Sequence, residues 1–287
     1  MTRSWPIPIP VLVYFALVFT ISWGGILVVA GPGGLLNSQA DPTELKQFIY
    51  FAALAGPSIA GILMTFLVGG KAGLRKLLHC LCRWRVDLRW YAIALLSAPL
   101  LMAAILFALS LASSGYVPAI YTTDDRVGLV ISGIVLGLTV SFFEELGWTG
   151  FATPELRKLY GFLPAGAIIG LPWGAWHFPL FSGSDSVSGT IPSTLYIAVL
   201  LFSFLVPFRI MMVWLYDRTR SVLVVMLMHA PLAAGQLIFL PEAMSRESAV
   251  TFDLVFGAAL WAIVAAIHVA SRGGRFFHET PHDASRH

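Results

Sequence analysis

Charged side chains are scarce in this chain. Asp, Glu, Lys and Arg make up 11% of its 287 residues, whereas a soluble domain carries roughly 25%. Hydrophobic residues make up 57% of the chain, and its mean hydropathy is +0.81. Apolar stretches near or above the ~20 residues that cross a bilayer follow one another along the sequence. The composition therefore excludes a soluble domain and predicts a polytopic membrane protein.

The apolar runs also lack the alternation of polar and apolar residues that is typical of outer-membrane strands, which excludes a β-barrel. The fold class expected is therefore all-α, a bundle of membrane helices. The net charge of +3 does not indicate a nucleic-acid partner, because the basic residues are confined to the predicted loops. The expected surroundings are a lipid bilayer.

Cysteine is nearly absent. Cys80 and Cys82 are the only two, and we expect them to be reduced thiols in a cytoplasmic loop. His79 stands beside them, but the four ligands of a structural metal site do not occur at recognisable spacings. Neither a disulfide framework nor a metal clip is expected there.

Eight membrane spans are predicted in a single domain that covers residues 1–287. The first apolar run exceeds the ~7–15-residue core of a signal peptide, so we expect it to be retained as a span. The predicted spans are 9–31, 47–69, 89–114, 127–150, 162–181, 192–215, 221–240 and 250–271.

Lys and Arg are distributed unevenly between the two sets of loops. Of the 18 such residues, Lys46, Arg126 and Arg246 fall in one set, Arg209 lies inside the sixth span, and the others fall in the opposite set. Because cytoplasmic loops carry the excess of positive charge, both termini are predicted to lie in the cytoplasm of a multi-pass protein of the cell membrane. The basic residues 71–89 are interpreted as a loop or an interfacial helix on anionic lipid, with substrate docking as the alternative.

Two glutamates and two histidines interrupt the apolar spans. Glu144 and Glu145 end the run that begins at residue 127, His177 lies in the fifth span, and His229 lies in the seventh. Ionisable residues are costly in a membrane and mark functional sites by default. We therefore predict that these side chains converge in one cavity enclosed by protein.

A turn at Gly161 would bring the glutamates to the level of His177. Glu145 lies 16 residues before this glycine and His177 lies 16 after it, so two antiparallel helices would juxtapose them. Pro154 argues against an unbroken helix and predicts a kink near residues 152–153. Neighbouring helical residues point about 100° apart, so one glutamate should face the reaction centre while the other orients a neighbour.

A glutamate with two histidines can support hydrolysis of an amide or ester by two routes. In the first, a divalent metal such as zinc, held by Glu144, His177 and His229, activates a water. In the second, Glu144 acts on water as a general base without a metal. In this second route His229 can donate to the tetrahedral oxyanion. An ion or proton pathway is the rival use, although the chain lacks the paired broken helices of a secondary transporter.

Three segments together resemble the CPBP family of intramembrane proteases, also called the CAAX-protease and bacteriocin-processing family or the ABI family. They read FFEELGWTGF, PWGAWHFPLF and SVLVVMLMHA, and similarity runs from about residue 55 to residue 240. The family motifs are EExxxR, [FW]xxxH and HxxxN. The resemblance implies eight transmembrane helices and a metalloendopeptidase-like enzyme, similar to type II CAAX prenyl proteases, that cuts a membrane-associated peptide or protein.

The resemblance also implies roles for individual residues. It implies Glu144 as the base that activates water, with His177 beside it. His229 and the residue four positions on would stabilise the oxyanion. Metal-dependent and metal-free forms of this chemistry both stay open. Nothing in the sequence indicates a prenylated substrate.

Two positions depart from the motifs. Thr149 stands in place of the arginine and cannot form its charge-assisted pair, so Glu145 is expected either to be protonated or to find another partner. Arg209 is the candidate, with snorkelling or pairing elsewhere as the alternative. Ala233 stands in place of the asparagine and cannot donate a hydrogen bond, and Gln236, on the helix face of the preceding histidine, is the candidate substitute.

These departures leave a second function open, that of a non-catalytic membrane protein of the same fold that confers immunity or chaperones a partner. The sequence offers two further cavity candidates, Trp173 and Trp176. We expect both to pack in the core, and a groove for a substrate helix is the alternative.

Overall fold

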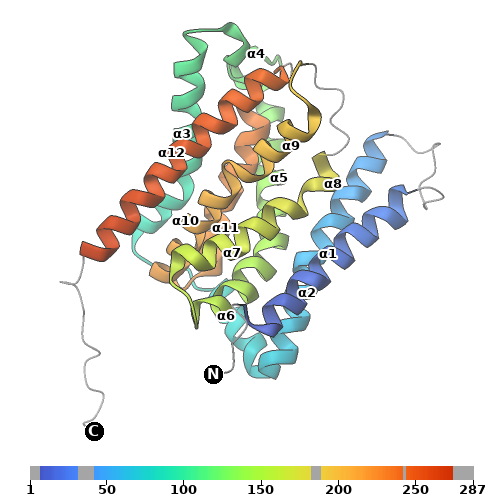
Figure 1. The fold of residues 1–287 in the computed structure, drawn as a ribbon, viewed down its shortest axis with the longest axis vertical. Coiled ribbons are helices and arrows are strands. Elements are labelled where there is room, and N and C mark those ends of the chain that lie inside the picture. Colours follow the sequence, from blue (N-terminus) through green and yellow to red (C-terminus); the bar gives the residue numbers. More distant parts are fainter. Residues whose placement is uncertain (1–6, 32–41, 182–188, 242–243, 274–287) are drawn as a thin grey trace.

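The computed structural model describes residues 7–31, 42–181, 189–241 and 244–273 of the chain. Regular structure in these ranges is entirely helical (Figure 1), which confirms the predicted all-α class. The longer helices are α1 (Ile9–Ala30), α2 (Pro42–Leu81), α3 (Leu88–Ser110), α5 (Arg126–Gly147), α7 (Phe162–Trp176), α9 (Ser193–Phe202), α10 (Leu205–Thr219), α11 (Val222–Ile238) and α12 (Arg246–Gly273). Short helical segments are η1 (Ser114–Tyr116), α4 (Ala119–Thr122), η2 (Trp148–Ala152), α6 (Thr153–Arg157) and α8 (Phe178–Phe181).

Every predicted span contains an apolar helix, and the polytopic membrane bundle is confirmed. Within the described ranges, six stretches are long and apolar enough to cross a membrane, whereas α7 and α11 have only 15 and 17 residues. The six stretches are Ile9–Ala30, Gln47–Leu81, Leu88–Ser110, Arg126–Arg157, Ser193–Thr219 and Arg246–Ser271. The cytoplasmic location of the termini stays a prediction.

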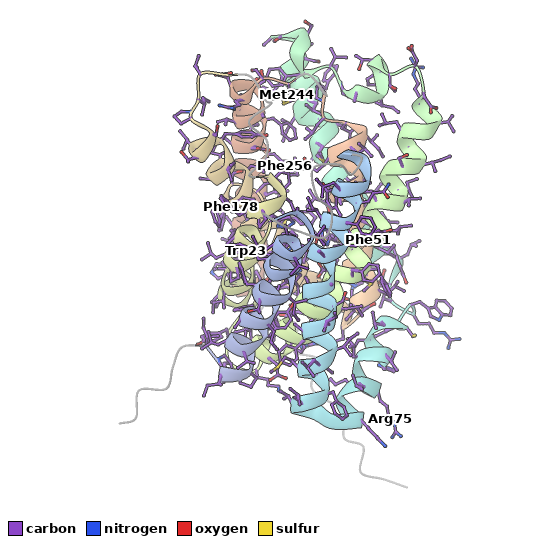
Figure 2. The ribbon with its side chains drawn as sticks, turned by 90° about the vertical axis from the view of Figure 1, so that its right-hand side faces the viewer. Trp23, Phe51, Arg75, Phe178, Met244 and Phe256 are labelled. Carbon is purple, nitrogen blue, oxygen red and sulfur yellow. The ribbon has the colours of Figure 1, made fainter. Side chains whose placement is uncertain are left out.

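The helix of the second span extends beyond the predicted end. Gly70 has a φ of 57° and a ψ of −151°, a conformation that glycine adopts far more readily than other residues. The chain turns there and continues as a helical segment to Leu81, so the basic stretch is helical over its first half. This segment, marked by Arg75, lies at the lower end of the molecule in Figure 2. Its helical form agrees with the interfacial-helix interpretation.

The fourth span continues helically past the two glutamates, although Pro154 argued against an unbroken helix. After α5, η2 forms one turn of π-helix and leads directly into α6. Pro154 lies in the first turn of α6, where the missing N–H of proline is tolerated. The Thr153 hydroxyl donates to the carbonyl of Trp148 at 2.9 Å. The proline therefore causes a π-helical turn instead of a break, and the chain reverses at Gly161, the N-cap of α7.

Small residues allow α2 and α5 to pack closely. A Cβ on Gly147 would lie 2.2 Å from the carbonyl oxygen of Pro57, and one on Gly61 would lie 2.4 Å from the Cα of Gly147. The Ser58 hydroxyl donates to the carbonyl of Phe143 at 2.6 Å. Close backbone contact of this kind holds helices together in lipid, where hydrophobic burial offers little. The contact positions the end of α5, which carries both glutamates.

The sixth predicted span is divided into α9 and α10, and α10 is the helix most enclosed by others. It packs against α7, α11 and α12, and nearly all of its residues are buried. Because α10 is enclosed by other helices, Arg209 in its second turn is carried into the core instead of reaching a membrane surface.

Candidate functional site

The predicted convergence of the acidic and imidazole side chains is found in the structure. Glu144 on α5, His177 at the C-terminal end of α7 and His229 on α11 line one cavity of about 300 Å³. Glu145 lies behind His229 and bonds to it. Glu144 and His229 expose only 1% and 3% of their surfaces. The chain segments that meet here are far apart in sequence, and the cavity lies between α2, α5, α7 and α11.

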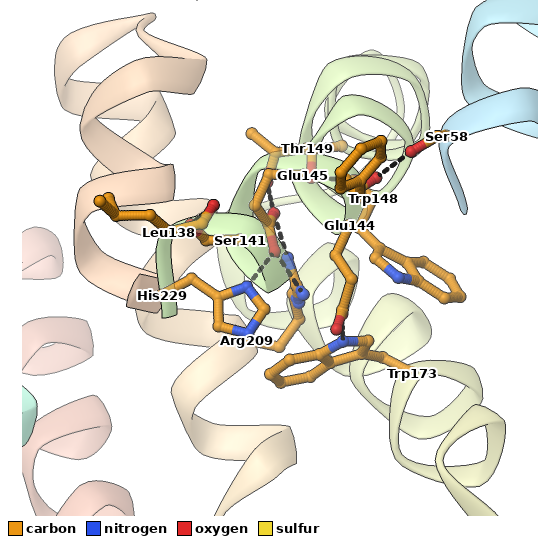
Figure 3. A network of polar contacts seen from close by, with 12 residues as sticks. Ser58, Leu138, Ser141, Glu144, Glu145, Trp148, Thr149, Trp173, Arg209 and His229 are labelled. Atoms are coloured by element: carbon orange, nitrogen blue, oxygen red, sulfur yellow. Dashed lines mark hydrogen bonds and ion pairs between the residues drawn. The ribbon is translucent and has the colours of Figure 1, made fainter. Parts of the chain in front are cut away.

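Glu145 is the centre of a buried hydrogen-bond network (Figure 3). Arg209 donates to both of its carboxylate oxygens, from Nη1 to Oε2 at 2.7 Å and from Nη2 to Oε1 at 3.0 Å. The Thr149 hydroxyl also donates to Oε2, and the Nδ1 of His229 lies 2.8 Å from Oε1. Bidentate, charge-assisted pairs of this kind are among the strongest side-chain contacts. Arg209 thus takes the place of the absent motif arginine, and the snorkelling alternative is wrong.

Glu144 points away from that network into the cavity. Its Oε2 accepts a hydrogen bond from the indole Nε1 of Trp173 at 2.6 Å. Its Oε1 lies 4.0 Å from the Nε2 of His177, and no hydrogen bond to Oε1 is recorded among the described residues. The two adjacent glutamates therefore have different surroundings, one held by an arginine and one facing open space, as the 100° helical offset predicts.

The hydrogen bonds of the two histidines determine which ring nitrogens are free. The Nδ1 of His177 lies 2.7 Å from the carbonyl oxygen of Trp173. A carbonyl only accepts, so Nδ1 carries the proton, and in the neutral ring Nε2 keeps its lone pair. The Nδ1 of His229 similarly donates to the carboxylate of Glu145. Both imidazoles can therefore offer Nε2 as an acceptor or metal ligand.

Trp173 connects every part of the cluster. Besides its bond to Glu144, its ring lies under the guanidinium of Arg209, with Cζ 4.0 Å from the ring centroid. The rings of His177 and His229 meet it edge-on at 5.5 and 5.4 Å. Sequence reasoning placed Trp173 near the site but missed its hydrogen bond to the carboxylate. The available signal was its position four residues before His177, on the same helix face.

Trp176 is buried against the same cluster. It is 1% exposed, its ring lies 4.7 Å from that of His177, and its indole Nε1 has no hydrogen-bond partner among the described residues. The expected packing role of both tryptophans agrees with their burial, and both also line the cavity. The indole N–H of Trp176 is thus an available donor in the cavity region.

The rest of the cavity wall is mostly apolar. Ala233 and Gln236 contribute from α11, and Tyr50 and Leu54 contribute from α2. The Nε2 of Gln236 is buried and has no hydrogen-bond partner within the described ranges. Sequence reasoning missed the α2 residues because no charge or motif distinguishes them from other apolar span residues. The cavity therefore combines a polar end with walls suited to apolar groups.

The described residues contain one group of side chains close enough to hold a metal ion together. Glu144, Glu145 and His229 each place a ligand atom within 4.8 Å of the others. The predicted set contained His177 in place of Glu145. Both oxygens of Glu145 already bind Arg209, whose positive charge competes with a metal. Cys80 and Cys82 are free, as expected, and do not belong to this group.

The donor atoms left free by the hydrogen bonds suit a zinc-like ion. They are one carboxylate oxygen and two imidazole nitrogens, from Glu144, His177 and His229, and this combination is common in zinc sites with an open position. The carboxylate of Glu145 and the carbonyl of Trp173 hold the two imidazoles in the manner of outer-shell partners. The donor types therefore suit a metal, but His177 lies outside the group whose ligand atoms are all within 4.8 Å of one another.

A bundle of apolar helices around a buried glutamate–histidine cluster defines a multi-pass membrane protein with an intramembrane polar site. The family model described as type II CAAX prenyl endopeptidase Rce1-like matches residues 126–233. The chain is also 30% identical over 98 residues to the "CAAX prenyl protease 2" of Methanococcus maripaludis, an alignment that covers 33% of this chain. Over this region the chain is similar to the CPBP, or CAAX protease, family, in agreement with the resemblance of its motifs.

The matched region contains every member of the buried cluster. Residues 126–233 include both glutamates, both histidines and Arg209. The chain spans only 36% of the length of the curated relative in the alignment. The alignment therefore does not by itself assign the activity of that relative to this chain.

Proposed function

We propose that this protein is an intramembrane endopeptidase that hydrolyses a peptide bond in a membrane-associated peptide or protein. One observation carries the proposal. One carboxylate oxygen of Glu144 and the Nε2 atoms of His177 and His229 are not used in the hydrogen bonds described above, and all three residues line one cavity among the membrane helices. The family match supports it. The apolar cavity walls favour apolar side chains near the bond that is cut.

In the proposed mechanism Glu144 is the base. Trp173 holds its Oε2, so Oε1 is directed at the cavity, where it takes a proton from water. The water oxygen bonds to the peptide carbonyl carbon, and the carbonyl oxygen becomes an oxyanion. Glu144 then delivers the proton to the amide nitrogen as the C–N bond breaks. A positioned general base of this type contributes about 10²–10⁴-fold to the rate.

We further propose that Glu144, His177 and His229 hold a divalent ion such as zinc. When bound, it would supply Lewis-acid polarisation and a water of lowered pKa. Glu145 then acts through His229, because Arg209 occupies both of its oxygens. In the metal-free route Oε1 of Glu144 is the base instead of a ligand, and metal analysis separates the two routes.

The metal proposal predicts about one zinc ion per purified chain, a ratio that elemental mass spectrometry measures. His229→Ala should remove most of it, because the variant loses one of three ligands and the partner of Glu145. A chelator should abolish cleavage, and added zinc should restore it. The double variant C80S/C82S is the control and should keep the metal. A wild-type protein that cleaves peptide without bound metal would leave only the general-base route.

Gln236 is proposed as the oxyanion donor in place of the motif asparagine. Its Nε2 has no partner in the described part of the chain, and it lines the cavity with Ala233. Gln236→Met should lower kcat roughly 10²–10³-fold with little change in KM, the cost of losing one oxyanion donor. Adding Ala233→Asn, which restores an amide at the motif position, should recover activity. Unchanged kcat in Q236M would exclude this role.

Ala233 is also the observation that favours the second function, a non-catalytic immunity or chaperone protein of the same fold. The two functions are separated by incubating purified protein in nanodiscs with a library of synthetic single-span peptides and identifying products by mass spectrometry. Defined cleavage products support the endopeptidase. Bound but intact peptides support the non-catalytic alternative.

A further inference from the structure

A second and larger cavity lies apart from the glutamate–histidine site. It has a volume of about 650 Å³ and shares no lining residue with the first cavity. Three segments form it: α2 on both sides of the Gly70 turn, η2 with α6, and the C-terminal end of α10. In Figure 1, α6 and the end of α2 lie at the lower end of the bundle. The cavity is therefore located where several helices end, not in the middle of the bundle.

Positive charge dominates the lining of this second cavity. Among the lining side chains, Glu155 is the single carboxylate, and it pairs with Lys158 at 2.6 Å. Asp217, just outside the lining, binds Arg157 at 2.6 Å. The lining cations are Lys76, Arg83, Arg157, Lys158 and Arg220, with His79 beside them.

Two of these cations have no acidic partner. No ion pair is recorded for Lys76 or Arg83 among the described residues, and both side chains are exposed. An ammonium and a guanidinium facing one hollow are the groups that proteins use to bind phosphate. The cavity therefore has uncompensated positive charge that an anion would neutralise.

The lining also contains an unsatisfied hydroxyl. The Oγ1 of Thr65 is buried and has no hydrogen-bond partner in the described ranges, and the residue is 8% exposed. The backbone carbonyl of Thr65 lies close to the helical segment that follows the Gly70 turn. A Cβ added to Gly73 in that segment would be 2.7 Å from the carbonyl oxygen of Thr65. A buried hydroxyl without a partner is costly, and a bound anion would accept its hydrogen bond. Thr65 lines the cavity, so its hydroxyl is a candidate donor to a bound ligand that does not depend on the surface charge.

The surroundings of the cavity are those of a membrane boundary. Immediately before the turn, Phe66, Leu67 and Val68 expose 47%, 64% and 45% of their surfaces, as lipid-facing residues do. Beyond it, Trp84 is 61% exposed, in keeping with the enrichment of tryptophan at headgroup depth. A ligand bound here would have an anionic end among the cations and apolar chains beside α2.

We propose that this cavity binds the phosphate headgroup of an anionic phospholipid, in the leaflet that the Lys and Arg distribution predicts to be cytoplasmic. The turn at Gly70 and the close contact of α2 with Gly150, where a Cβ would lie 2.6 Å from Leu77 Cδ1, form the hollow. Basic pockets between membrane helices on this side are known to suit such headgroups. The proposal is independent of whether the first cavity cleaves peptides.

The experiment is native mass spectrometry of the full chain in neutral detergent, titrated with phosphatidylglycerol. K76Q/R83Q should weaken binding roughly 30-fold, following from the usual contribution of each basic residue near an anionic headgroup. The matched control R75Q/R85Q removes the same charge from exposed residues that do not line the cavity, and it should change affinity less than about twofold. T65V, which changes no charge, should weaken binding about tenfold.

Three outcomes would overturn the proposal. Equal losses in both double variants would show diffuse surface charge instead of a site. Phosphatidylcholine that binds as tightly as phosphatidylglycerol would remove the role of the anionic headgroup. Inorganic phosphate that displaces the lipid at equal concentration would identify a site for free phosphate. Peptide cleavage is not a readout in any arm, so failure here and failure of the proposed endopeptidase are distinguishable.

Discussion

Replacing Glu144 by glutamine is expected to lower the turnover of a membrane-bound peptide roughly 10²–10⁴-fold. The amide cannot take a proton from water, which is the step assigned to Oε1 of Glu144. Its carbonyl oxygen can still accept the hydrogen bond from Trp173 Nε1 that is seen at 2.6 Å in the structure. The variant should therefore fold, and the loss should appear in kcat. Initial rates with a cleaved peptide from the nanodisc library provide the measurement.

The matched control for this variant is Asp253→Asn. Asp253 on α12 is a carboxylate as buried as Glu144, at 3% exposure, but it does not line the glutamate–histidine cavity. The same change from acid to amide should leave turnover within about twofold, because it does not touch the reacting groups. Retained cleavage in E144Q would exclude Glu144 as the base. Equal losses in both variants would attribute the effect to the removal of any buried acid.

Replacing Arg209 by methionine is expected to cost about 3–5 kcal/mol of unfolding free energy. The substitution leaves the carboxylate of Glu145 buried with only Thr149 and His229 as partners. It also removes the cation from the face of Trp173. A buried charge without a counterion is far costlier than an exposed one. Equilibrium unfolding in mixed detergent micelles measures the change.

The double variant E145Q/R209M compares the stability cost of losing the whole ion pair with the cost of losing Arg209 alone. Because it removes both charges, it should be more stable than R209M alone, as is found when buried ion pairs are replaced together. The control is Arg89→Met, since Arg89 pairs with Asp87 at 3.3 Å and the two side chains are 68% and 55% exposed. Loss of such a surface pair should cost at most about 1 kcal/mol. An R209M protein as stable as R89M would contradict the inferred role of the buried pair.

Much of the site was predictable because the membrane makes ionisable side chains informative. The equal spacing of Glu145 and His177 about Gly161 predicted that a reversal there would bring the glutamates to the level of His177. Glu144 and His177 do lie 4.0 Å apart, although α7 packs mainly against α10 and not against α5. Arg209 was a candidate partner because it is the one strongly basic residue inside a predicted span. The pairing of Arg209 with Glu145 could not be concluded from the sequence. The sixth predicted span is broken between α9 and α10, and this break changes which face of the helix that carries Arg209 points inward.

Other features had no such signal. Pro154 predicted a kink, but the π-helical turn of η2 keeps the chain helical. The metal prediction named His177, whereas the side chains within mutual reach are Glu144, Glu145 and His229. Distances of this size depend on side-chain rotamers and on how deeply α11 packs against α5. The hydrophobic periodicity of the sequence contains no information about side-chain rotamers or about the packing depth of α11.

By itself, the sequence determined the all-α membrane class, the positions of the apolar helices and the set of polar residues that must meet. Each follows from one physical fact, that lipid accepts neither unpaired backbone groups nor isolated charges. Only the tertiary structure decided that Arg209 holds Glu145, that Glu144 faces the cavity, and that the basic segment after Gly70 folds over a second hollow. These depend on which side chains of separate helices come into contact, and that contact is set by close packing of glycines and tryptophans across the bundle.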